Sequence, residues 1–190
     1  SFATVLSALA LVISGLSYYE TTLKSADLSV FVPPMIHYAR DMDGDVFNVP
    51  ITIANDGARS GTVLALELEV ENLQADAPKK SARFYSAYLG EYATSDAVPN
   101  RSFAPLSIPG HGTFTETVRF YPMSTKTKPY VVADKGDYRF TLKLMTATPD
   151  HTDQAKATAI APLVFQMNLP YISQQHLEYR HGTIAMTNAN

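Results

Sequence analysis

The sequence predicts an all-β protein: an antiparallel β-sandwich of about seven strands, preceded by one N-terminal transmembrane helix. Three observations support this fold class. The first 19 residues carry no charge. Several later segments alternate apolar and polar residues, and turn-forming residues separate them. The composition of 11 Tyr and 9 Phe without Trp also suits strands, which favour aromatic side chains.

The N-terminal segment, residues 1–19, is uncharged up to Glu20. As a helix with a rise of about 1.5 Å per residue it spans roughly 28 Å, close to the hydrocarbon core of a bilayer. Too little apolar sequence precedes the small residues 8–10 for a cleaved signal peptide, and the segment lacks the polar face of a soluble helix. We therefore expect a single membrane anchor, followed by a linker over residues 20–26.

Small residues recur along the anchor at spacings of three and four, so they share one side of the helix. Such residues let helix backbones approach closely in a bilayer, which predicts a face that packs on partner helices, although Ser and Ala are also common in such segments. The stripe consists of Ala3, Ser7, Ala10, Ser14 and Ser17.

The first half of the domain contains three expected strands. Residues 28–32 form a short strand that Pro33 and Pro34 stop, and residues 37–47 are expected to turn into the next strand. That strand points Phe47, Val49, Ile51 and Ile53 to one face.

The third strand covers residues 62–72 and directs Leu64, Leu66, Leu68 and Val70 inward. Its alternate glutamates are expected to form a solvated face, because side chains two apart on a strand lie near 7 Å from each other and point into water.

The second half is less regular. Residues 82–93 are read as a strand with Phe84, Ser86 and Tyr88 on one face. The alternative is a short helix with Phe84, Tyr88 and Tyr92 on one side. Residues 113–122 and 137–146 alternate clearly, and the latter directs Tyr138, Phe140, Leu142 and Leu144 inward. Residues 158–168 form a last strand, for which Pro162 indicates an edge position. The tail, residues 170–190, is either a helix with an arm or a further strand. We assign 27–169 to the sandwich and 170–190 to a C-terminal extension.

The segment DKGDYRF, residues 134–140, resembles the D-x-G-x-Y-x-C segment of immunoglobulin-like domains, with Asp134, Gly136 and Tyr138 matching. The resemblance implies a tyrosine corner, in which the Tyr hydroxyl bonds to nearby backbone. Phe140 stands where that family has its second disulfide Cys, and an aliphatic residue such as Leu66 replaces its core Trp. The resemblance therefore implies a divergent immunoglobulin-like sandwich.

The wider layout resembles a class of small bacterial proteins with one N-terminal anchor and no assigned activity. The resemblance rests on two turn segments and one strand end. The matching residues are Asn55, Asp56, Gly57, Arg59 and Gly61, then 105–110, then 120–122.

Composition narrows the chemistry. The absence of Cys excludes disulfides, thiolate metal sites and Cys nucleophiles. A formal net charge of −3 argues against nucleic acid as the main partner. The chain contains no nucleotide-binding fingerprint and no nucleophile elbow, so we expect a non-catalytic protein without a cofactor. A weak metal candidate is the trio Asp41, Asp43 and Asp45, whose spacing departs from that of a calcium loop.

An aromatic cluster is the main interface candidate, because Tyr is enriched at protein interfaces. It consists of Phe84, Tyr85, Tyr88 and Tyr92. The sequence thus predicts a single-pass membrane protein with its β-domain on the periplasmic or extracytoplasmic side. We expect it to act as an accessory or interaction subunit that binds other membrane subunits, or copies of itself, within the lipid bilayer. A pilin-like filament subunit and a carbohydrate- or ligand-binding module are the alternatives.

Overall fold

The computed structural model describes residues 2–41, 44–90, 101–147, 158–173 and 182–189. One α-helix, α1 (Phe2–Tyr18), is extended by the π-helical turn η1 (Tyr19–Leu23). The described strands are β1 (Leu28–Phe31), β2 (Met35–Asp41), β3 (Gly44–Asn55), β4 (Gly61–Asn72), β5 (Ser81–Leu89), β6 (Arg101–Ser102), β7 (Leu106–Ile108), β8 (Thr113–Pro122), β9 (Gly136–Thr146), β10 (Thr158–Ala159), β11 (Leu163–Leu169) and β12 (Ile184–Asn188).

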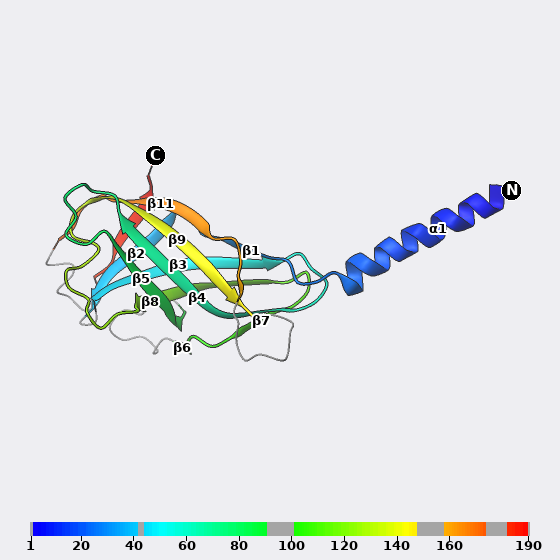
Figure 1. Cartoon of the computed structure of the whole chain (residues 1–190), viewed down its shortest axis with the longest axis horizontal. Helices are drawn as coiled ribbons and strands as arrows, with labels where there is room; N and C mark the ends of the chain where they lie inside the picture. The colour runs from blue at the N-terminus through cyan, green and yellow to red at the C-terminus, as the bar shows by residue number, and fades with distance from the viewer. Residues whose placement is uncertain (1, 42–43, 91–100, 148–157, 174–181, 190) are drawn as a thin grey trace.

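Within these residues, eight strands close into an antiparallel barrel. Their order is β9, β11, β12, β2, β3, β8, β5 and β4, and β4 pairs back on β9 over most of its length. The shorter strands β1, β6, β7 and β10 attach to β3, β5, β4 and β9. Figure 1 shows the helix leaving one end of this barrel and projecting away from it.

The expected immunoglobulin-like sandwich is therefore wrong. A sandwich keeps two sheets apart, whereas here strands join them on both sides. β5 pairs with both β4 and β8, and β12 pairs with both β11 and β2. The two joining strands come from the segments that the sequence predicted least firmly, residues 82–93 and the tail. β5 is a strand, so the helical alternative for that segment is wrong as well.

Another error concerns residues 37–47, where the sequence predicts a turn. Residues 35–41 instead form β2, which pairs with β3. β1 pairs with the other half of the same β3 edge, so β1 and β2 are two pieces of one long strand. Pro33 and Pro34 separate the two pieces, because proline cannot donate to the ladder.

The barrel core is assembled from the inward faces of the long strands. All four inward residues expected on β3 and all four on β9 are buried. Aromatic rings fill the centre, where Phe47 lies edge-on to Phe84 at 5.0 Å and to Phe140 at 5.3 Å between ring centroids. Phe140 thus fills core space at the position where the resemblance has a Cys.

Two β-bulges change which residues of β4 and β5 point inward, so the predicted inward faces are partly wrong. A register shift between Val63 and Ala65 makes Val63 a fully buried residue and leaves Leu64 only half-buried. A second shift between Ser86 and Tyr88 turns Tyr88 outward. Because side chains alternate with a period of two, one extra residue reverses the faces that follow it.

The tyrosine-corner contact is present although the sandwich is not. The hydroxyl of Tyr138 donates to the backbone oxygen of Asp134 at 2.5 Å. Gly136 has a φ of 137°, a left-handed conformation that glycine adopts most readily. Since this contact spans only four residues, it depends on the local turn before β9, and it is compatible with a barrel.

Candidate functional site

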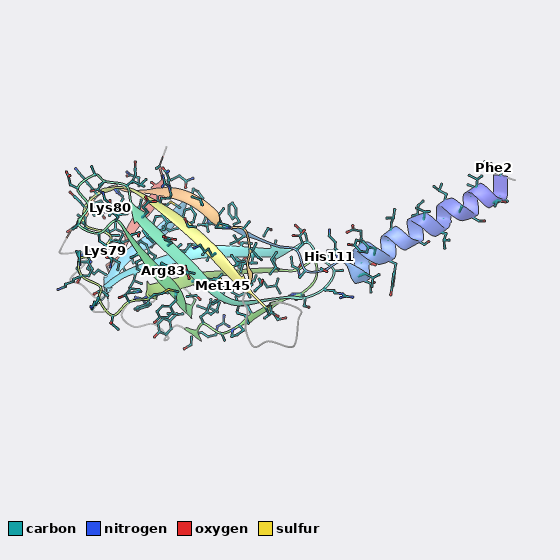
Figure 2. All side chains as sticks on the ribbon, viewed as in Figure 1. Phe2, Lys79, Lys80, Arg83, His111 and Met145 are labelled. Atoms are coloured by element: carbon teal, nitrogen blue, oxygen red, sulfur yellow. The ribbon has the colours of Figure 1, made fainter. Side chains whose placement is uncertain are left out.

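The apolar helix is the most unusual surface of the molecule. Residues Phe2–Leu23 form a helix of 22 residues that is long and apolar enough to cross a membrane, and none of its most apolar window is buried by the rest of the chain. Phe2 lies at the far tip, away from the barrel (Figure 2). Length and composition fit a membrane span, and they also fit a signal sequence near the N-terminus.

All five residues of the predicted stripe lie on this helix and are exposed. The hydroxyl of Ser7 donates to the backbone oxygen of Ala3 at 3.0 Å, so its polar atom is satisfied within the helix. A side chain added at Gly15 would meet no atom within 4 Å. The surface of the helix is therefore open to another helix or to lipid.

The helix ends in residues typical of a membrane–water boundary. Tyr18 and Tyr19 are 58% and 50% exposed, and aromatic rings of this kind favour the headgroup region. One turn later, Lys24 forms an ion pair with Glu20 at 3.2 Å, and both groups are solvent-accessible. Charged side chains thus follow within a few residues of the last apolar turn of the helix.

A clasp centred on Asn55 holds the linker that follows the helix. The Asn55 side chain is 1% exposed, and its Oδ1 accepts the backbone N–H groups of Asp27 and Gly57, each at 3.0 Å. Its Nδ2 donates to the backbone oxygens of Arg59, Ile108 and Pro109 at 2.8 to 3.1 Å. One amide therefore joins the linker to two separate turns.

Close backbone packing completes the clasp, which comprises residues 24–27, 55–61 and 108–112. A Cβ at Gly57 would lie 1.9 Å from the backbone oxygen of Ser25, and one at Gly110 would lie 1.9 Å from that of Ala58. The backbone N–H groups of Ala58 and Arg59 both donate to the oxygen of Lys24. The two turn segments quoted from the sequence thus meet at one place, next to the end of the apolar helix. His111 marks this end of the barrel in Figure 2.

Asp45, one of the three metal candidates, instead forms a buried polar cluster. Its Oδ1 accepts from the Tyr38 hydroxyl at 2.7 Å and from Arg40 at 3.2 Å, and its Oδ2 accepts the backbone N–H groups of Val131 and Val132. Burial raises the pKa of the Asp45 carboxyl, while the nearby Arg40 guanidinium acts in the opposite direction.

Both oxygens of Asp45 are thus occupied by donors of the protein. The Asp43 residue and the side chain of Asp41 lie outside the described part of the chain. Among the described residues no group of three or more His, Cys, Asp or Glu side chains gathers as a metal site would.

The aromatic interface candidates divide between the core and the surface. Phe84 is a core residue, 1% exposed, so it contributes nothing to a surface. Tyr85 and Tyr88 are 45% and 37% exposed, and Tyr88 packs edge-on against Tyr121 at 5.7 Å. Tyr92 lies outside the described residues.

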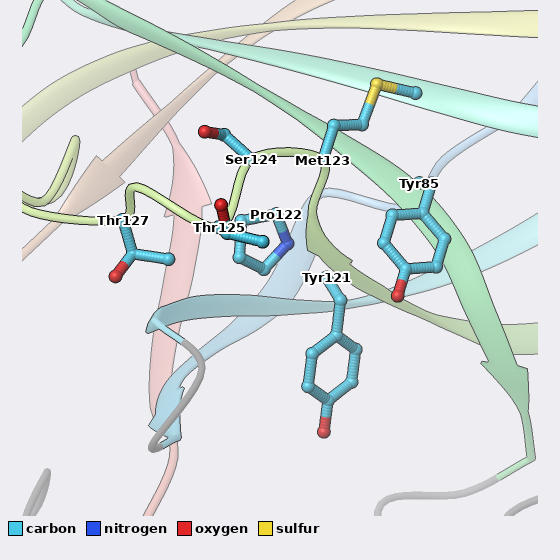
Figure 3. A pocket seen from close by; sticks show the side chains of 7 residues that line it. All are labelled: Tyr85, Tyr121, Pro122, Met123, Ser124, Thr125 and Thr127. Atoms are coloured by element: carbon cyan, nitrogen blue, oxygen red, sulfur yellow. The ribbon is translucent and has the colours of Figure 1, made fainter.

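Tyr85 and Tyr121 line an open pocket of about 370 Å³. Figure 3 shows the two rings on one side of it, with Met123 and the Ser124–Thr125 turn beside them. A neighbouring pocket of about 420 Å³ shares Pro122, Met123 and Ser124 with the first, and it is bordered by the acidic Glu69 and by three basic side chains. These are Lys79, Arg83 and Lys126. The sequence indicated Tyr85 but gave no sign that Tyr121 and the loop after β8 form a pocket with it.

Comparisons with known proteins leave the family open. No family model and no curated protein matches the chain. One similar solution structure is that of a chain assigned as a late embryogenesis abundant (LEA) protein. Its TM-score is 0.42 and its sequence identity 16%, and the match covers 89% of this chain and 90% of that one. A chain from Bordetella pertussis assigned as ApaA has TM-score 0.33 and 18% identity, and the match covers 74% of this chain and 94% of that one.

A third similar structure is a β-glucosidase from Paenibacillus barengoltzii. Its TM-score is 0.36 and its identity 16%, and the match covers 84% of this chain but 18% of the enzyme. Likenesses of this size carry no inference about activity.

Proposed function

We propose that this chain is a membrane-anchored, non-catalytic accessory or interaction subunit of a membrane protein assembly. One N-terminal span holds it in the bilayer, and the barrel lies on the extracytoplasmic side. It binds other membrane subunits through the helix and through the barrel surface.

The observation that carries the proposal is the unburied apolar helix over Phe2–Leu23. Apolar surface is unfavourable in water, and this helix buries none of its apolar window against its own chain. A bilayer removes that surface from water, and the small-residue stripe then allows a second helix to pack closely.

The clasp supports a role in which the position of the barrel matters. A flexible tether would let the barrel move freely, whereas here the linker makes backbone hydrogen bonds to the 55–61 turn directly after the helix ends. A barrel held at a fixed place beside the bilayer suits a subunit that contacts neighbours at a fixed height.

Gentle detergent solubilisation followed by identification of the co-purifying chains tests the proposal. We expect a complex of fixed composition. The double variant Ala10→Leu with Ser14→Leu fills the small-residue stripe with larger side chains, so this chain should no longer co-purify with the complex. The control Val12→Leu lies on the opposite side of the helix and should leave the complex intact. A lone monomer would refute the proposal, and so would filaments built from this chain alone.

Sidedness is tested with a single introduced cysteine, because the natural chain has none. Asp76→Cys lies in an exposed loop. We expect a membrane-impermeant maleimide to label it in intact cells as completely as after permeabilisation. Labelling only after permeabilisation would place the barrel in the cytoplasm and contradict this part of the proposal.

A further inference from the structure

The eight-strand barrel is closed, but among the described residues a gap is left at one end of its wall, between β1 and β11. β12 lies between β11 and β2, but it pairs with β11 at two positions only, Met167 with Asn188 and Asn168 with Thr187. Beyond these pairs, in the described residues, segments 28–32 and 163–166 have no strand partner on their facing sides. We call the space that these two segments border the seam. Figure 1 shows β1 toward the barrel end that adjoins α1.

The hydrogen bonds at the end of β12 show how far apart the two walls of the seam lie at the point where the seam begins. The backbone N–H of Asn188 donates to the oxygen of Pro34 at 3.0 Å. The next residue, Ala189, donates to the oxygen of Gln166 at 3.3 Å on the other side. One strand therefore bridges the two walls at this point. Since adjacent strands lie about 4.8 Å apart, the walls are separated by about two such spacings, which is room for one strand.

The β1 wall presents backbone groups to the seam. In an antiparallel ladder, alternate residues point their N–H and C=O groups to opposite neighbours. The N–H of Asp56 donates to the oxygen of Asp27, so residues 29 and 31, which are in phase with Asp27, bond to β3. The N–H and C=O groups of Val30 and Val32 accordingly point into the seam.

The β11 wall has the matching arrangement. The oxygen of Gln166 bonds across to Ala189, so Gln166 faces the β12 side of the ladder. Val164, two residues earlier, has the same phase and presents its N–H and C=O to the seam. A strand that continues the path of β12 would alternate between Val164 on one wall and Val32 and Val30 on the other. An extended peptide backbone satisfies groups placed in this way.

Apart from Ser29 and Gln166, the side chains that border the seam are apolar, and they are incompletely covered. Phe31 and Val164 are 62% and 55% exposed on the outer face. The inward side chains pack against the core but remain only partly buried, namely Leu28, Val30, Val32, Leu163 and Phe165. Neither segment contains a charged residue. An inserted strand would cover these side chains with its own apolar residues, and a charged strand would find no partner for its charges.

We infer that the seam is a docking site for an extended, uncharged segment of a partner membrane subunit, with apolar residues at alternate positions, running antiparallel to both β1 and β11. This inference rests on the proposed function, because β1 begins within a few residues of the helix end and the seam therefore lies beside the bilayer. A segment of a partner subunit that leaves the membrane at this place would reach the seam directly.

A strand supplied by the chain itself tests whether the seam accepts one. The probe is a chain of residues 1–190 in detergent with Thr-Val-Thr-Val placed after Asn190, which points both valines inward if the β12 register continues. The matched control adds Thr-Pro-Thr-Pro, which lacks the amide donors that face β1. We expect the first extension alone to slow amide hydrogen exchange in segments 28–32 and 163–166 by about tenfold or more. Equal exchange in both extended chains overturns the inference.

The same two chains test the partner. In the native membrane, the Thr-Val extension should occupy the seam and abolish co-purification of the partner subunit, whereas the Thr-Pro extension should leave it intact. An intact complex with both extensions overturns the docking site but leaves the proposed function standing. An unextended chain that purifies alone refutes both, and a dimer of this chain overturns the choice of partner.

Discussion

Replacing Asn55 by Asp tests the reasoning about the clasp most directly. The substitution keeps the oxygen that accepts from Asp27 and Gly57 and replaces the NH₂ group by a second oxygen. That oxygen would then face three backbone carbonyl oxygens at about the distances that Nδ2 now has, 2.8 to 3.1 Å. The two hydrogens that the carbonyls share are lost.

The magnitude follows from burial. Asn55 is 1% exposed and its bond to the oxygen of Ile108 is buried, so that carbonyl gains no water in exchange. Each unsatisfied buried acceptor costs about 1–3 kcal/mol, and an unpaired buried carboxylate adds to this. We expect a loss of about 3–5 kcal/mol in unfolding free energy at neutral pH. For a chain of this size that corresponds to roughly 6–20 °C in melting temperature.

The assay is thermal unfolding of the full chain in detergent micelles, followed by the far-ultraviolet circular dichroism of the strands. The new carboxyl should have a raised pKa, since the folded state favours its protonated form, which can donate again. Stability of Asn55→Asp should therefore recover as pH falls and decline as pH rises. The control is Asn188→Asp at an exposed position of β12. A change within about 0.5 kcal/mol of wild type at neutral pH would show that Asn55 does not hold the clasp.

Other substitutions test separate parts of the structure. Gly57→Ala should destabilise the chain by about 2–4 kcal/mol and expose the linker to proteases, because the new Cβ meets a backbone oxygen, whereas Gly15→Ala on the open helix should be neutral by the same unfolding and proteolysis assays. Tyr138→Phe should cost about 1–3 kcal/mol in denaturant unfolding if the corner hydrogen bond counts, and an unchanged midpoint would reduce it to an ordinary turn. Asp45→Asn should cost about 2–4 kcal/mol, because one of its two sides must then point an NH₂ group at existing donors; a thermal shift no larger than that of a surface Asp would contradict this.

Local pattern was sufficient for most of the strands. The alternation in residues 113–122 predicted β8 with its observed bounds, and the inward sets on β3 and β9 are buried as expected. Such predictions succeed because a strand with one wet face must place its apolar residues at every second position. They fail at bulges, as at Leu64 and Tyr88, where partner strands decide which residue is skipped.

The site was only partly predictable. The sequence identified the apolar N-terminal helix and its small-residue stripe, since both follow from hydropathy and helical spacing. It also contained both turn segments of the clasp, but nothing in it indicated that residues 55–61 and 105–110 meet around one Asn side chain. Contacts between segments some 50 residues apart in sequence depend on the pairing of β3 with β8 and of β4 with β7.

The sequence by itself determined that this protein is a β-domain carried on one apolar helix, because periodicity and hydropathy are local properties of the chain. Only the tertiary structure decided that the domain is a barrel. Closure depends on β5 and β12, two strands of weak pattern that are stabilised by neighbours on both sides rather than by their own alternation. The tertiary structure likewise decided which strand edges stay open, because the seam between β1 and β11 exists only once the neighbouring strands have paired.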